Sequence, residues 1–193
     1  MTRLSALSLL LAFALGALSA ALPAMAADPA PPLPEAISTE EFRDVLVQAG
    51  DRLFIAGQPT EAGLEEMAAA GVVTVINLRT DREMDDRNVV PFDEAAKVAE
   101  LGLDYVHIPA GGPATPYDAD MVARFADAVA EADGKVLLHC TVAWRASHLY
   151  VAYLHRYRGL PLSEAIEHGQ AINFGTLPLE GFLGAPLEIG TAQ

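Results

Sequence analysis

The stretch VLLHCTVAWRASHLYVAYLHR, Val136 to Arg156, decides the fold and contains the only cysteine of the 193-residue chain. Its first residues are apolar and end at a histidine, as in a short buried strand, and a helical pattern begins near Arg145. We therefore predict a strand over 135–139 and a helix over 145–159. Cys140 lies directly at the carboxyl end of the predicted strand, one short loop before the helix.

The rest of the chain alternates between strands and helices in the same way. Apolar, β-branched runs predict strands, and amphipathic runs that end near Gly predict helices. The further strands are predicted over 52–57, 72–78 and 104–110, and the further helices over 60–71, 91–102, 118–134 and 161–172. Strands separated by helices indicate an α/β fold, with a mostly parallel central sheet flanked by helices. Ligands of such sheets bind beyond the carboxyl ends of the strands, which is where Cys140 lies.

The amino-terminal segment predicts export. Arg3 is followed by an apolar run from Leu4 to about Leu22, which ends in Ala24-Met25-Ala26, the A-x-A pattern of a cleavage site. We expect 1–26 to be a signal peptide, and the protein to be periplasmic or secreted with no stable membrane insertion after its removal. A retained anchor is the alternative, because about 20 apolar residues cross a bilayer. We expect 27–50 to be a Pro/Ala-rich linker, 51–175 a single domain, and 176–193 a carboxyl-terminal tail.

Composition narrows the possible partners. Removing 1–26 leaves 167 residues and takes away only one charge, so that the net charge moves from −14 to −15. Such acidity argues against nucleic acid and anionic lipid as ligands. A single cysteine cannot form an internal disulfide, so Cys140 is a free thiol or pairs with another molecule. No spacing of His, Cys and Asp resembles a zinc site, and we expect neither metal nor cofactor.

The six residues from Cys140 to Arg145 have the chemistry of an anion site. The unpaired amides of a helix start bind anions, and the helix dipole stabilises a thiolate. The planar fork of an arginine suits a tetrahedral oxyanion. A thiolate beside such a cradle is suited to attack on phosphorus or on sulfur. The alternative is an ordinary buried cysteine with an arginine that decorates the helix start.

Three stretches carry a resemblance to a known family: LFIAGQPTEAGLEEMAAAGVVTVINLR, VHIPAGGPATPYDADMVARFADAV and KVLLHCTVAWRAS. Together they resemble the dual-specificity and protein-tyrosine-phosphatase-like superfamily, and within it the bacterial beta-lactamase hydrolase-like, phosphatase-like branch, over about residues 51–172. The resemblance implies a cysteine-phosphatase-like fold and a phosphomonoester substrate, small molecule or protein. It implies Cys140 as the nucleophile and Arg145 as the oxyanion-binding residue. The substrate-binding residues expected around them are Thr141, Val142, Ala143, Trp144, Ser147 and Arg79.

The sequence departs from the dual-specificity pattern in its loop. Four residues separate Cys140 from Arg145 where five are usual, and the bulky Val142 and Trp144 stand where a glycine is expected. A hydroxyl usually follows the arginine directly, but here the hydroxyl of Ser147 comes one position later.

The general acid is also missing from its usual place, because 110–116 contains no carboxylate. Asp81 and Glu83 follow the 72–78 strand on the same rim and are the candidates for the acid, ahead of Asp118, which we expect to cap a helix. Two other hypotheses stay open. One is a rhodanese-like sulfurtransferase that carries a persulfide on Cys140, and the other is a non-catalytic binding module.

Overall fold

The computed structural model describes residues 31–175 and 178–187, so the predicted signal peptide lies outside the described residues. Six strands form one sheet in the order β1-β2-β3-β6-β4-β5. The strands are β1 (Glu35–Ala36), β2 (Leu46–Ala49), β3 (Leu53–Ala56), β4 (Val72–Asn77), β5 (Asp104–His107) and β6 (Lys135–His139). Strands β3, β6, β4 and β5 are parallel, and β1 and β2 add antiparallel pairs at one edge. The predicted mostly parallel sheet is confirmed.

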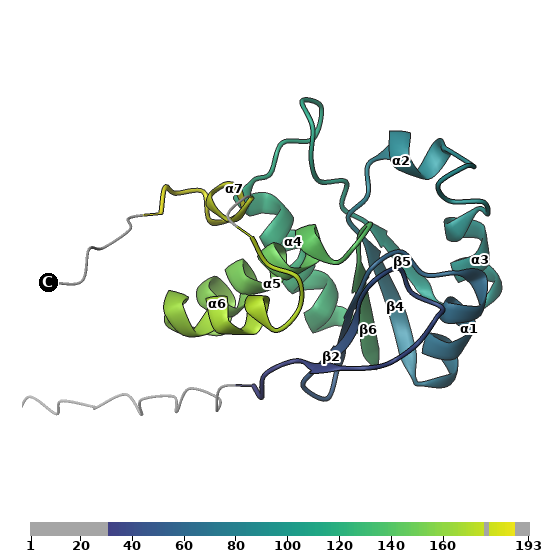
Figure 1. Ribbon diagram of the computed structural model, residues 1–193, viewed down its shortest axis with the longest axis horizontal. Coiled ribbons are helices and arrows are strands. Elements are labelled where there is room, and N and C mark those ends of the chain that lie inside the picture. The colour runs from purple at the N-terminus through teal and green to yellow at the C-terminus, as the bar shows by residue number, and fades with distance from the viewer. Residues whose placement is uncertain (1–30, 176–177, 188–193) are drawn as a thin grey trace, which may run out of the picture.

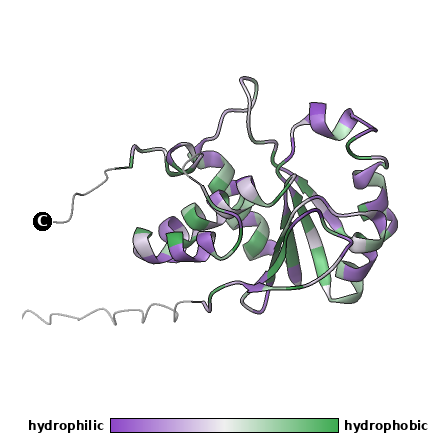
Figure 2. Ribbon diagram, viewed as in Figure 1, coloured by the Kyte–Doolittle hydropathy of each residue, from purple (hydrophilic) through white to green (hydrophobic). Residues whose placement is uncertain are grey.

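Helices cover both faces of this sheet, as Figure 1 shows. In chain order they are α1 (Glu61–Ala69), α2 (Asp81–Asp85), α3 (Glu94–Glu100), α4 (Ala119–Glu131), α5 (Trp144–Tyr157), α6 (Leu162–Gln170) and α7 (Leu179–Leu183). Helices α1 and α3 lie on one face, and α4 and α5 lie on the other, with α6 and α7 packed against α5. The sheet and the helix surfaces turned toward it are largely hydrophobic, whereas the outer helix surfaces are hydrophilic (Figure 2). Apolar burial on both faces therefore fixes the layers.

Strand β6 shows how alternation distributes side chains between the two layers. Val136 and Leu138 belong to the core shared with α4 and α5, and Leu137 belongs to the core on the side of α1 and α3. His139, two residues after Leu137, lies on the same face of the strand as Leu137. Its Nε2 lies 3.0 Å from Oε1 of Glu94 on α3. Cys140 returns to the side of α4 and α5. His139 and Cys140 therefore lie on opposite faces of the sheet, as the alternation of side chains along a strand requires.

The predicted domain boundaries need two corrections. The described part of the expected linker is no tether, because β2 pairs with β3 and Val47 is buried in the main core. The expected tail contains α7, whose Leu179 and Phe182 are buried in the same core. Both elements are short, and four or five residues are too few for a periodic hydrophobic pattern to distinguish them from a loop.

Within the described ranges, no helix is both long enough and apolar enough to cross a membrane.

The packing of α7 predicts a stability effect. Phe182 has no exposed surface, and replacing it with alanine should lower the free energy of unfolding by about 3–5 kcal/mol, since it removes a large buried ring and leaves a cavity. Urea unfolding followed by circular dichroism measures this. Leu33→Ala is the control, because Leu33 is 52% exposed and its loss should change stability by less than about 0.5 kcal/mol. Equal small effects of the two changes would place α7 outside the cooperative core.

Candidate active site

The loop between β6 and α5 turns sharply at Ala143, the residue before the helix. Ala143 has φ of 60° and ψ of 0°, a left-handed conformation, and is completely buried. This conformation costs a residue other than glycine about 1 kcal/mol, so the surrounding structure must hold it in place. The sequence has the bulky Val142 and Trp144 in this loop, and the chain places its left-handed turn on the small alanine between them.

Two neighbouring segments hold the loop from either side. The amide of Gln58 donates to the Thr141 carbonyl oxygen at 3.1 Å, and Asn173 Nδ2 donates to the Val142 carbonyl oxygen at 2.7 Å. Gly57 faces Val142 in an isolated β-bridge, and a Cβ added at Gly57 would lie only 1.8 Å from the carbonyl oxygen of Arg43. Only glycine therefore allows this close approach.

The guanidinium of Arg145 contacts the loops that follow β4, β5 and β6. Its Nη1 donates to the carbonyl oxygens of Leu78 and Ala110, at 3.2 and 2.8 Å. Its two terminal nitrogens grip the carboxylate of Glu83, with Nη1 2.9 Å from Oε2 and Nη2 2.7 Å from Oε1. Nη2 also donates to Thr141 Oγ1 at 2.8 Å. Burial opposes the charge of Arg145, but the hydrogen bonds to Glu83 and the charge of Cys140 outweigh it and raise the pKa of the guanidinium.

Glu83 is an anion in this arrangement. Burial acts to raise its pKa, but hydrogen bonds from Arg145 and Thr80 outweigh burial and lower the pKa from 4.5 to about 2. Oε2 accepts from the amide and the hydroxyl of Thr80, both at 2.9 Å, in a capping box that starts α2. Oε1 accepts from the hydroxyl of Thr141 at 2.9 Å. A group held this way has no proton to give, so the predicted role of Glu83 as general acid has no support in this geometry.

A second arginine lies behind the same carboxylate. Arg79 is 1% exposed, its Nη1 donates to Gln58 Oε1 at 2.7 Å, and its Nε lies 3.5 Å from Glu83 Oε1. Burial is the largest cause that lowers the pKa of Arg79, and the charge of Glu83 acts in the opposite direction. Among the described residues, Arg79 Nε is a buried nitrogen without a hydrogen-bond partner. Two guanidinium groups share one carboxylate, which leaves a surplus of positive charge beside Cys140.

Cys140 itself is 1% exposed and lies against the core under α5. Its charge acts on both guanidinium groups, Arg79 and Arg145, and on the hydroxyl of Tyr117. The predicted neighbourhood of the thiol and Arg145 is therefore present in the structure.

The space in front of these groups is a pocket of about 450 Å³, which we call the rim pocket. It is lined by Thr80, Arg82, Glu83, Asp86, Val89, Gly111, Gly112, Tyr117 and Arg145. The lining does not include Cys140, so a ligand in the pocket meets Arg145 and Glu83 before it meets the thiol.

Below the rim, a buried polar network supports the site. Glu94 accepts from Gln58 Nε2 at 2.6 Å, from Asn77 Nδ2 at 2.9 Å and from the hydroxyl of Tyr105 at 3.2 Å, in addition to its contact with His139. Burial acts to raise the pKa of Glu94, but His139 and these hydrogen bonds outweigh it and lower the pKa. Because Gln58 also binds Arg79, the network fixes the second guanidinium from beneath.

Asp81, Asp118 and Ser147 are three of the predicted residues that do not line the rim pocket. Asp81 is exposed, and its carboxylate lies 3.5 Å from His107 Nδ1. Asp118 caps α4 by accepting from the amide of Met121 at 3.0 Å, as expected. The buried hydroxyl of Ser147 lies 2.8 and 2.6 Å from the carbonyl oxygens of Trp144 and Asn173, so its predicted contact with substrate has no support in this geometry.

Sequence reasoning missed Tyr117, Glu94 and Gln58. Tyr117 directly precedes the predicted helix 118–134, Glu94 lies in the first turn of the predicted helix 91–102, and Gln58 lies between a predicted strand and a predicted helix. Nothing local to these residues indicates that they meet at one site.

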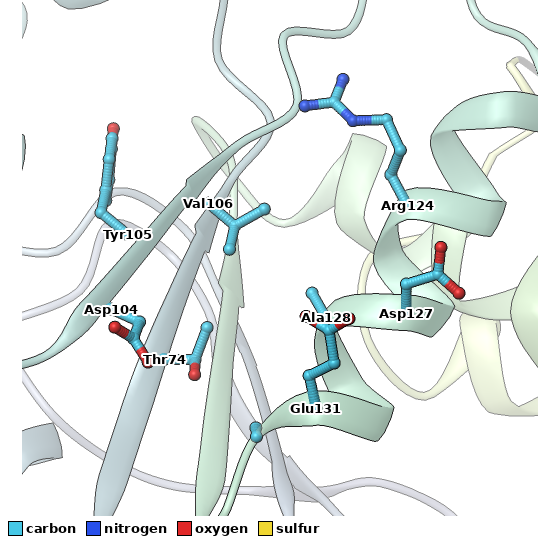
Figure 3. A pocket seen from close by; sticks show the side chains of 9 residues that line it. Thr74, Asp104, Tyr105, Val106, Arg124, Asp127, Ala128 and Glu131 are labelled. Carbon is cyan, nitrogen blue, oxygen red and sulfur yellow. The ribbon is translucent and has the colours of Figure 1, made fainter.

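A separate pocket of about 540 Å³ lies between β5 and α4 (Figure 3). Arg124, Asp127 and Glu131 of α4 line it, and Val106 points toward it from the edge strand. None of the predicted catalytic residues lines it. In the described part of the chain, no group of three or more His, Cys, Asp or Glu residues could hold a metal ion.

Comparisons with known proteins identify the family of the chain. Residues 45–153 match the family model described as "Beta-lactamase hydrolase-like protein, phosphatase-like domain". A beta-lactamase hydrolase-like protein of Agrobacterium fabrum is 40% identical over 105 residues, which cover 54% of this chain and 24% of that protein. The chain thus spans about a quarter of the length of the curated relatives it matches.

Solved structures show the same fold. A DUF442 protein of Shewanella putrefaciens CN-32, described as a candidate phosphatase, is 29% identical with a TM-score of 0.58, over 74% of this chain and 90% of that one. TpbA of P. aeruginosa, in complex with phosphotyrosine, is 21% identical with a TM-score of 0.55, over 74% of this chain and 78% of that one. The expected cysteine-phosphatase-like fold is confirmed.

The pKa of Glu83 predicts a pH effect on stability. Its folded pKa of about 2 lies below the ordinary value of 4.5, so Glu83 stabilises the folded state above that ordinary value, and this contribution is lost as the pH falls toward 2. The difference in unfolding free energy between wild type and Glu83→Gln should be constant at neutral pH and shrink through this acidic range. Urea titrations of both proteins at several pH values measure it. A difference that stays constant down to pH 2 would contradict the ion pair.

The polar network predicts a larger loss. Glu94→Gln replaces an acceptor with an amide that opposes the surrounding donors, and it should lower the free energy of unfolding by about 3–5 kcal/mol. Glu100→Gln, at the exposed end of the same helix, is the matched control and should change stability by less than about 0.5 kcal/mol. Thermal and urea unfolding measure the loss of stability in each variant. Similar losses in the two variants would show that the stability of the fold does not depend on the network.

Proposed function

The chain belongs to the family of beta-lactamase hydrolase-like, phosphatase-like domains, and we propose that it is a cysteine-dependent phosphatase that hydrolyses a phosphomonoester. The observation that carries this proposal is the carboxylate of Glu83, held by both terminal nitrogens of Arg145 beside the only thiol of the chain. A guanidinium fork matches the two oxygens of a carboxylate and two oxygens of a phosphate in the same way. Glu83 thus occupies the place that a phosphoryl group takes when substrate binds.

In this mechanism, the substrate phosphate displaces Glu83 from the fork. Two phosphoryl oxygens bind the terminal nitrogens of Arg145, and the hydroxyl of Thr141 contributes a further hydrogen bond. The first amides of α5 have no acceptor within the helix and face the bound oxygens. Sγ of Cys140 then attacks phosphorus as the bond from phosphorus to the leaving oxygen breaks, which gives an S-phosphocysteine intermediate. Water hydrolyses this intermediate in a second step and releases phosphate and the thiolate.

The displacement is favoured by charge. A phosphate dianion carries more charge than a carboxylate, and the surplus from Arg79 and Arg145 attracts it more strongly. Glu83 belongs to α2, a five-residue helix in which no residue is buried, so the helix can move outward at low cost in packing. Substrate binding is therefore an exchange of anions at one fork.

The rim pocket sets what the substrate can be. Its lining is polar at Thr80, Arg82 and Tyr117 and apolar at Val89, which is 41% exposed. The rim pocket accepts a phosphate group on a small molecule or on a protein side chain. The chemistry that these substrates share is the phosphomonoester, which is the substrate class we propose. Export to the periplasm or beyond is proposed on the sequence of residues 1–26 alone.

The non-catalytic and sulfur-transfer hypotheses make different predictions for the same site. A binding module would keep Glu83 in the fork permanently. A sulfurtransferase would carry sulfur on Cys140 without needing a proton donor. One set of assays separates all three.

We expect the wild type to hydrolyse p-nitrophenyl phosphate, with inorganic phosphate as a competitive inhibitor. Cys140→Ser should abolish turnover, and Arg145→Lys should lower kcat/KM by about 100-fold, because lysine cannot bind two oxygens in parallel. Arg52 directly precedes β3 and therefore lies at the end of the sheet opposite to Cys140. Arg52→Lys is the matched control and should retain full activity.

Thiosulfate and cyanide provide the second assay. Thiocyanate formation that depends on Cys140, without phosphate release, would establish sulfur transfer in place of hydrolysis. Inactivity in both assays, combined with measurable phosphate binding, would favour the binding module.

A further inference from the structure

Cleavage of a phosphomonoester needs a proton at the leaving oxygen, and the carboxylates of the site do not supply it. Glu83 is ionised in the grip of Arg145, and Asp118 caps α4. Asp81 does not line the rim pocket. Asp86 does line it, but its carboxylate accepts hydrogen bonds from the amide and side chain of Asn88 at the exposed edge.

Tyr117 provides a hydroxyl in the same pocket. It precedes the cap of α4, and its ring packs against Phe182 with centroids 5.2 Å apart. A Cβ added at Gly181 would lie 2.6 Å from the Tyr117 Cβ, so α7 holds the backbone of Tyr117 closely. Ring and backbone are both fixed, which leaves the hydroxyl little freedom.

The hydroxyl end is fixed by the loop that precedes it. A Cβ added at Gly111 would lie 3.0 Å from the Tyr117 hydroxyl oxygen, so the hydroxyl lies directly over the Gly111 backbone. That backbone is tied into a tight turn, because the Gly111 amide donates to the Thr115 carbonyl oxygen at 2.6 Å and the Thr115 hydroxyl donates back at 2.7 Å. Both Gly111 and Tyr117 line the rim pocket together with Arg145.

The proton of this hydroxyl is available. Within residues 31–175 and 178–187, no hydrogen bond uses the Tyr117 hydroxyl, unlike that of Tyr105, which is committed to Glu94. Burial is the largest cause that raises the pKa of Tyr117, and the charges of Cys140 and Glu83 act in the same direction against that of Arg145. The group therefore keeps its proton at neutral pH.

Resting on the phosphatase function proposed above, we propose that Tyr117 is the proton donor to the leaving oxygen of the substrate. As the bond from Cys140 Sγ to phosphorus forms, the bond from phosphorus to the leaving oxygen breaks, and its electron pair stays on that oxygen. The Tyr117 proton moves to this oxygen and releases an alcohol or phenol. In the second step, water attacks phosphorus, its proton returns to the Tyr117 phenolate, and the thiolate leaves.

The test compares leaving groups. p-Nitrophenolate is stable enough to leave without a proton, whereas the phenolate released from phenyl phosphate needs one more strongly. Tyr117→Phe should therefore lower kcat/KM for phenyl phosphate by about 100-fold and that for p-nitrophenyl phosphate far less. Phenylalanine keeps the ring packing on Phe182, and an unchanged Tm confirms the fold. Tyr157→Phe, at a half-exposed tyrosine on α5, is the matched control and should leave both rates unchanged.

Each other outcome overturns the assignment. An equal loss on both esters would make Tyr117 a residue that only positions substrate, and no loss on either ester would exclude it from catalysis. A wild type no faster than Cys140→Ser on both esters would overturn the phosphatase proposal itself, and the role of Tyr117 with it.

Discussion

The guanidinium of Arg145 is the point on which the carboxyl-terminal rim of the sheet depends. It joins the loop after β4, the loop after β5, the loop that bears Cys140, and α2, all through hydrogen bonds from two nitrogens. Such a charge is costly to bury unless it is paired and its donors are satisfied. Glu83 supplies the pairing, and two backbone carbonyls and the hydroxyl of Thr141 accept the other hydrogen bonds of the two terminal nitrogens. The rim is thus organised around one buried guanidinium, which is stable only when an anion pairs with it. For the same reason, the site is suited to bind phosphate.

The rigidity of that site comes from the layer beneath it. Glu94 is buried and is bound by groups from β4, β5 and β6 and from the loop that follows β3, so it connects the four parallel strands on the face opposite Cys140. The side chain of Gln58 connects this network to Arg79 by accepting a hydrogen bond from its guanidinium. The backbone amide of Gln58 donates to the carbonyl oxygen of Thr141 and fixes its position. The active rim and the supporting network therefore share one residue. A preorganised cradle needs such a second layer, because dipoles stabilise a developing charge only if they do not have to reorient.

The parts of this architecture that could be predicted from the sequence are those that are encoded locally. The position of Cys140, at the end of a strand and shortly before a helix, follows from hydrophobic periodicity in one stretch of about twenty residues. The helix begins at Trp144, one residue before the predicted start. The pairing of Arg145 with Glu83 joins residues 62 positions apart and could not be predicted that way. Likewise, β2 and α7 could not be predicted from a local pattern, because they are short and are stabilised by the packing of their buried residues in the core. Glu83 was identified from its place on the rim, yet its protonation depends on a partner that no local pattern names.

The contacts of Asn173 have a consequence for how the protein is made. Protein synthesis begins at the amino terminus, so Val142 is made 31 residues before Asn173, which donates a hydrogen bond to its carbonyl oxygen. Until that asparagine has been synthesised, the loop that carries Cys140 lacks one of its two supports. The chain contains no second thiol with which this sulfur could form a wrong internal bond. A disulfide that forms before folding is complete can therefore join the chain only to another molecule.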